Sequence, residues 1–153
     1  MKQLKLLSIL FIFISLSQCG YSPMLSENSG DFFIKNISFE GDRKINNYIS
    51  NNLKKYQVSE NKTKEYSIKI NSSYQKNIIN KDDSGNPKNY QLLARINIDL
   101  LLPGGESITK LFERSVTLTA QTKRITEKEI EKKQKEELSD NLSKDIIFFL
   151  NNK

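Results

Sequence analysis

The stretches YSIKINSSYQ (66–75) and QLLARINIDLL (91–101) decide the fold, because apolar and polar residues alternate through both of them. A period of two is the pattern of a β-strand with one buried face. The apolar positions are nearly all even-numbered: Tyr66, Ile68, Ile70, Tyr74, Leu92, Ala94, Ile96, Ile98, Leu100 and Leu102. These two stretches therefore predict neighbouring antiparallel strands with one covered face.

The segment between the two stretches predicts an unusually long hairpin. Residues 81–88, KDDSGNPK, are rich in turn formers and join the strands. At about 3.3 Å per residue, strands of some fourteen residues reach roughly 45 Å, which is long for a small domain. We therefore expect the hairpin tip to project beyond the core.

The flanking sequence predicts two further strands and two helices. Residues 32–40 read as a first strand, and residues 108–122 as a fourth strand that follows the Gly104-Gly105 turn. Between the first two strands, apolar residues fall at helical spacing over 43–56, and Asp42 is the expected N-cap.

The last segment predicts a helix that begins at Thr126. Glu129 follows three residues later, which matches a capping box. An apolar stripe then continues to the end of the chain through Ile130, Leu138, Leu142, Ile146 and Leu150. A coiled coil is the alternative, but the stripe does not keep a heptad over enough turns.

Taken in order, these elements are β-α-β-β-β-α. We expect an α+β fold, a two-layer sandwich in which a four-stranded, antiparallel-rich sheet carries two helices on one face. The domain is expected to span residues 32–153.

The N-terminus has the pattern of a bacterial lipoprotein precursor. Lys2 and Lys5 precede the uncharged run 6–16, which is too short to cross a bilayer and has the length of a signal-peptide core. Cys19, the only cysteine, follows Leu-Ser-Gln in a tetrapeptide that resembles a lipobox. We expect residues 1–18 to be a signal peptide; the alternative is an unlipidated thiol behind an ordinary signal.

Lipidation of Cys19 would tie the domain to a membrane without spanning it. Two or more acyl chains, such as palmitate, anchor stably, whereas a single chain does not. Residues 19–31 contain Gly, Ser and Pro and are expected to form a polar tether. Gly20 after the cysteine favours delivery to the outer membrane, with the domain on its periplasmic side.

Composition excludes several classes of function. The chain has no histidine and one cysteine, so we expect no metal site, no cofactor and no Ser-His or Cys-His catalysis. The segment 82–86 lacks the spacing of a calcium loop. Lys and Arg outnumber Asp and Glu by 24 to 18, mainly through lysine, which is compatible with anionic lipids but does not indicate a nucleic-acid partner. We expect a protein that is not an enzyme.

The chain resembles the LPS-assembly lipoprotein family LptE. The resemblance rests on the start CGYSPM (19–24), on a strand of the type of residues 37–39 followed at once by a helix, and on the strand and turn of residues 90–104 ahead of a last strand and a closing helix. It covers nearly everything from Cys19 to the C-terminus. Gln18 and the many lysines depart from the usual family pattern.

The resemblance implies a lipoprotein that plugs and helps to assemble the large outer-membrane β-barrel LptD and that binds lipopolysaccharide during its transport to the outer leaflet. Cations near the hairpin would contact the phosphates. The candidates are Lys76, Lys81 and Lys88, followed by Lys110 and Arg114 on the next strand. The alternative is a structural or auxiliary lipoprotein subunit of another envelope lipid-transport complex.

Overall fold

The computed structural model describes residues 30–59, 61–102 and 104–153. The elements are β1 (Phe32–Gly41), α2 (Arg43–Leu53), the 3-10 turn η1 (Lys54–Gln57), β2 (Lys64–Lys81), β3 (Pro87–Leu101), β4 (Ser107–Thr119) and α3 (Arg124–Asn151). The predicted signal peptide, Cys19 and most of the predicted tether lie outside the described residues.

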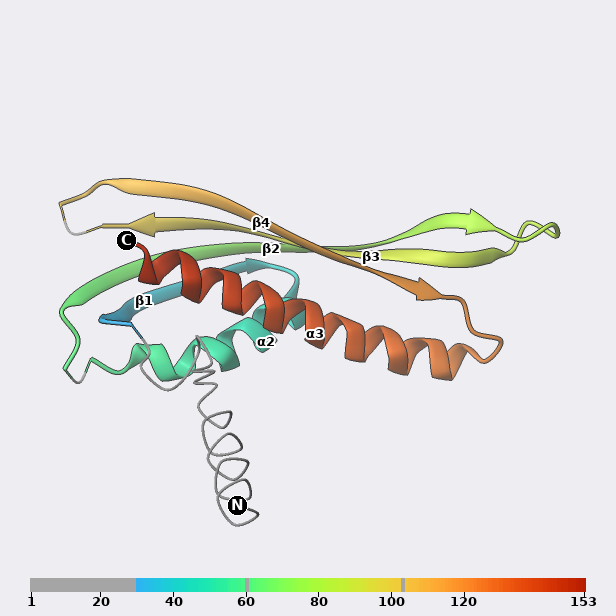
Figure 1. The fold of residues 1–153 in the computed structure, drawn as a ribbon, viewed down its shortest axis with the longest axis horizontal. Coiled ribbons are helices and arrows are strands. Elements are labelled where there is room, and N and C mark those ends of the chain that lie inside the picture. The colour runs from blue at the N-terminus through green and yellow to red at the C-terminus, as the bar shows by residue number, and fades with distance from the viewer. Residues whose placement is uncertain (1–29, 60, 103) are drawn as a thin grey trace, which may run out of the picture.

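The four strands form one sheet in the order β1-β2-β3-β4. β1 pairs with β2 in parallel, as the intervening α2 requires, and the other two pairings are antiparallel. Both helices lie on the same face of the sheet (Figure 1). The predicted α+β sandwich with two helices on one face is confirmed.

The core lies between the sheet and the two helices. On β3 the even-numbered residues from Leu92 to Leu100 are buried, and they meet the buried stripe of α3 that runs from Leu138 to Leu150. Each fully buried aliphatic side chain stabilises the fold by about 1.5–3 kcal/mol. The strand periodicity therefore identified the covered face correctly.

A close approach between β1 and β2 fixes the turn into α2. Gly41 has φ +91°, and a Cβ there would lie 1.8 Å from the carbonyl oxygen of Ser72, so only glycine fits. The next amide, of Asp42, donates to that same carbonyl at 3.0 Å. α2 therefore starts at a point that β2 holds in place.

The two helices begin differently. The Asp42 carboxylate accepts from the amides of Lys44 and Ile45 at 2.9 Å, which confirms the predicted N-cap. The predicted capping box at Thr126 is wrong, because α3 already begins at Arg124 and its N-cap Lys123 makes no side-chain hydrogen bond. Glu127 instead accepts from the amide of Gln121, ahead of the helix, at 3.2 Å.

The hairpin projects as expected (Figure 1). β4 ends at Thr119, opposite Asn89, so β2 and β3 continue to the tip as a two-stranded ribbon. Near the end of β4, Ile78 lies opposite Tyr90, and Ile78 and Ile79 are 49% and 54% exposed. The helices cover the base of the hairpin and leave its end bare.

Candidate functional site

The face of the sheet that the helices leave free is polar. Its side chains come from the odd-numbered positions of β2, β3 and β4, among them Ser67, Asn71, Ser73, Gln75, Gln91, Asn97, Glu113, Ser115 and Thr117. Charges on this face are matched across strands. Lys69 pairs with Glu40 at 2.8 Å, and Arg95 pairs with Glu113. The result is a wide, mostly polar surface, in which Leu101 and Leu111 are exposed apolar residues.

The hairpin tip carries two of the candidate cations. Lys81 and Lys88 are both exposed, and among the described residues neither forms an ion pair. Between them the Asp82 carboxylate accepts from the amides of Ser84 and Asn86 at 2.9 and 2.8 Å, which fixes the loop. These bonds lower the pKa of Asp82, and the bond from the Asn86 amide has the largest effect. The tip therefore presents two free ammonium groups on an ordered turn.

Lys76, in contrast, belongs to a cluster beneath the sheet. Its ammonium lies 2.7 Å from Glu127 and 3.0 Å from Glu131, both on α3, and 4.1 Å from the centre of the Tyr90 ring. Its side chain is only 24% exposed. The expectation that Lys76 is an exposed lysine at the projecting end is wrong, because its even-numbered position directs it towards the helices. We call Lys76, Glu127 and Glu131 the clamp.

Charge and burial oppose each other in the clamp. Burial alone would lower the pKa of Lys76, but hydrogen bonds to Glu127 and Glu131 raise it. The Lys76 bond lowers the pKa of Glu127. For Glu131, burial raises the pKa, and hydrogen bonds from Lys76 and from Tyr74 outweigh it, so the net direction is downward. All three groups are therefore held in their charged forms.

Tyr74 joins the clamp to a second lysine. Its hydroxyl donates to Glu131 at 3.0 Å, and burial followed by this bond raises the pKa of the phenol. The ammonium of Lys135 lies 3.4 Å from the centre of the Tyr74 ring, in a cation–π contact. Lys135 is 9% exposed, and burial lowers its pKa.

The two candidates on β4 differ from each other. Arg114 forms a two-pronged ion pair with Asp145 of α3, at 2.8 and 2.6 Å. Lys110 is exposed and has no ion pair among the described residues. The five sequence candidates therefore divide into two cations that bind the sheet to α3, Lys76 and Arg114, and three that are free.

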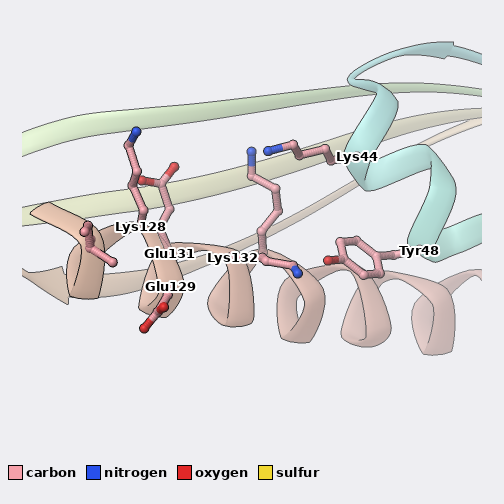
Figure 2. Close-up of a pocket in the computed structure, with 8 residues that line it drawn as sticks. Lys44, Tyr48, Lys128, Glu129, Glu131 and Lys132 are labelled. Carbon is pink, nitrogen blue, oxygen red and sulfur yellow. The ribbon is translucent and has the colours of Figure 1, made fainter.

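Sequence reasoning missed a hollow between the two helices. A space of about 530 Å³ opens there, lined by Lys44, Tyr48, Ile125, Lys128, Glu129, Glu131, Lys132 and Lys135 (Figure 2). We call it the basic groove. Three of its lysines occur at positions 128, 132 and 135, a spacing that puts them on one helical face, so the sequence did contain part of the signal. The contribution of α2 could not be read from it.

Two kinds of site are absent from the part of the chain that the structure describes. It contains no group of three or more acidic, cysteine or histidine side chains that could hold a metal ion. None of its helices combines the length and the apolar character needed to cross a membrane.

Solved structures share this fold. Rare lipoprotein B from Shewanella oneidensis superposes with a TM-score of 0.56 at 14% identity, covering 76% of this chain and 97% of that one. A putative lipoprotein from Caulobacter crescentus CB15 gives 0.53 at 13%, covering 78% and 88%. A minor lipoprotein from Acinetobacter baumannii gives 0.51 at 14%, covering 79% and 93%.

The similarity lies in structure and not in sequence. No protein-family model matches the chain, and no curated protein matches its sequence. At 13–14% identity the superpositions show the fold alone. The chain thus has a fold found in bacterial proteins described as lipoproteins.

Proposed function

We propose that this protein is a non-enzymatic lipoprotein of the bacterial outer membrane, anchored through Cys19, that plugs and helps to assemble an LptD-type β-barrel and binds lipopolysaccharide. The observation that carries the proposal is the fold, shared over most of their length with proteins described as rare and minor lipoproteins. The lipobox-like placement of Cys19 supports the anchor independently.

The free face of the sheet supports the role of a plug. The interior of a wide barrel is polar and water-filled, so a protein that occupies it needs a polar surface. The ion pairs Lys69–Glu40 and Arg95–Glu113 reduce the number of unpaired charges that this face would bring to such a wall. Because the helices cover the other face, the sheet is rigid enough to keep this surface in shape.

The hairpin tip supports contact with lipopolysaccharide. Lys81 and Lys88 offer free cations for phosphates, and Ile78 and Ile79 offer exposed aliphatic surface for acyl chains. Lys110 is a further free cation on the same sheet. Lys76 and Arg114 remain candidates in this proposal only if lipopolysaccharide displaces their carboxylate partners.

Photo-crosslinking in cells tests the barrel partner. A benzophenone residue replaces Thr117, which is exposed on the free sheet face, and, as a control, Phe148, which is 66% exposed on α3. We expect the probe at 117 to capture a large outer-membrane barrel encoded in the same genome. Capture of a periplasmic or inner-membrane transport subunit from both positions would instead support an auxiliary subunit of another lipid-transport complex.

Metabolic labelling tests the anchor. A clickable fatty acid should label the wild-type chain and leave Cys19→Ser unlabelled, with the labelled form in the outer-membrane fraction. Equal labelling of the two chains would contradict lipidation at Cys19.

A further inference from the structure

The basic groove gathers several lysines around one hollow. Four lysines line it, Lys44 from α2 and Lys128, Lys132 and Lys135 from α3. Among the residues that the structure describes, none of the four forms an ion pair, whereas Lys35, Lys69 and Lys76 each do.

The two carboxylates of the groove do not neutralise these lysines. Glu131 is already bonded to Lys76 and to Tyr74. Glu129 points away from the sheet, on the opposite side of α3 from the Glu131 carboxylate (Figure 2). The hollow therefore has four lysines in its lining against two carboxylates, one of them engaged elsewhere and the other directed away from the sheet.

Lys135 makes the groove more than a patch of surface lysines. Lys135 is 9% exposed and lines the hollow; its ammonium contacts the Tyr74 ring, and the Asp42 and Glu131 carboxylates act on it from beyond ion-pair distance. Burying an ammonium without a carboxylate at contact distance is unfavourable, and for Lys135 the effect of burial outweighs the two distant carboxylates. Like charges at i and i+4, such as Lys128 and Lys132, also weaken an isolated helix. An anion in the groove would relieve both costs.

The hollow continues along the seam between the helices. A second space of about 270 Å³ shares Lys44, Tyr48 and Lys132 with the first and adds the amides of Asn47 and Asn51. A bound group would thus meet cations at one end and neutral hydrogen-bonding side chains beyond them. Small multivalent anions suit such a cluster best, because several ammonium groups can share them.

We propose that the basic groove is a binding site for a phosphate monoester, either on a lipid headgroup or as free phosphate. Lys128, Lys132 and Lys135 would hold the phosphate oxygens from α3, and Lys44 would close the site from α2. The inference does not rest on the proposed function, since it needs neither the barrel nor lipopolysaccharide.

Amide chemical shifts of the lipidated full chain in a nonionic detergent test the site. Sodium phosphate is titrated in one arm, and micelles doped with phosphatidic acid in the other. We expect saturable shifts confined to residues 44–51 and 125–135. Tighter binding of the doped micelles assigns the site to a lipid headgroup, and tighter binding of sodium phosphate assigns it to free phosphate; both support it.

Matched variants make the test specific. Lys128→Gln/Lys132→Gln should weaken binding about tenfold or more. The control Lys123→Gln/Lys133→Gln removes the same charge from two exposed positions outside the groove, the N-cap of α3 and α3 itself, and should change binding less than about twofold. Lys135→Met should also weaken binding while a thermal melt shows it folded. Equal effects of the two pairs, shifts centred on residues 78–88, or no saturable shift with either probe would overturn the site. Capture of the barrel from position 117 is measured separately, so its failure would leave this result unaffected.

Discussion

The base and the end of the β2–β3 hairpin are built from the same two strands but have opposite surroundings. At the base, Ile96 is fully buried under the helices. Near the outer end, beyond Lys76, Ile78 and Ile79 on the same hairpin are about half exposed. The pairing of β2 with β3 continues past the point at which the helices cover the hairpin. The difference shows that a strand can be longer than its core requires, and that the excess length is available for contacts with another molecule.

The largest contrast should appear between isoleucines of the two halves. Ile96→Ala leaves a cavity in the core and should lower the free energy of unfolding by about 2–5 kcal/mol. Ile78→Ala, at a position 49% exposed, should change it by less than about 0.5 kcal/mol. Urea unfolding measures both. Similar losses at the two sites would mean that the hairpin end is covered after all.

The clamp marks the boundary between the two halves. Lys76→Met keeps the aliphatic stem but removes the charge-assisted bonds to Glu127 and Glu131, so the free energy of unfolding should fall by about 1–2 kcal/mol. Lys88→Met, at an exposed lysine of the tip, is the matched control and should be close to neutral.

The pH dependence of that loss identifies its cause. The pKa values of Glu127 and Glu131 are lowered from 4.5 in the folded state, so their contribution is complete above pH 4.5 and is lost as pH falls below it, through the lowered values. The difference in unfolding free energy between wild type and Lys76→Met should therefore shrink in acid. A difference that stays constant down to pH 2 would point to packing instead of charge.

Smaller effects are expected where the helices that cover the base begin. Asp42→Ala removes the cap of α2 and should cost about 1 kcal/mol. Thr126→Ala should cost less than about 0.5 kcal/mol, because α3 begins two residues earlier and makes no side-chain cap. Thermal melts compare the two. A larger loss of stability in Thr126→Ala than in Asp42→Ala would indicate that Thr126 does cap α3, as its sequence suggests.

The smallest effect on stability is expected at the tip, with the clearest effect on binding. Lys81→Glu/Lys88→Glu should change the free energy of unfolding by less than about 0.5 kcal/mol. Under the proposed function it should weaken lipopolysaccharide binding at low salt, and the difference should fade as salt screens the charges. Unchanged affinity in the folded variant would exclude the tip and direct attention to Lys110.

The strands and their faces could be predicted because a period of two is a local property of the chain. Ile96 and Leu100 are buried as their positions require, and the projecting hairpin follows from strand length. The same parity does not sort the candidate cations. Lys76 and Arg114 are even-numbered and both bind α3, but Arg114 is still 51% exposed. Lys88 and Lys110 are even-numbered as well, and both are exposed.

The partners of those cations could not be predicted, because they are distant in sequence. Glu127 and Glu131 lie 51 and 55 residues from Lys76. Their approach depends on where α3 crosses the sheet, which no local pattern encodes. Only one side of the basic groove could be predicted, for the same reason. The spacing of the lysines on α3 can be read from the sequence, but the position of Lys44 and Tyr48 opposite them is set by packing.

The start of the described chain and the hairpin tip lie at opposite ends of the molecule (Figure 1). Gly30 lies against Asn151, so both ends of the described chain meet at one pole. β2 leaves that pole and runs for 18 residues to Lys81, a reach of roughly 55 Å. The hairpin tip is thus the part of the domain farthest from its N-terminal end. If the whole domain tilted by about 10° about its N-terminal end, the tip would move by about 10 Å, with no rearrangement inside the fold.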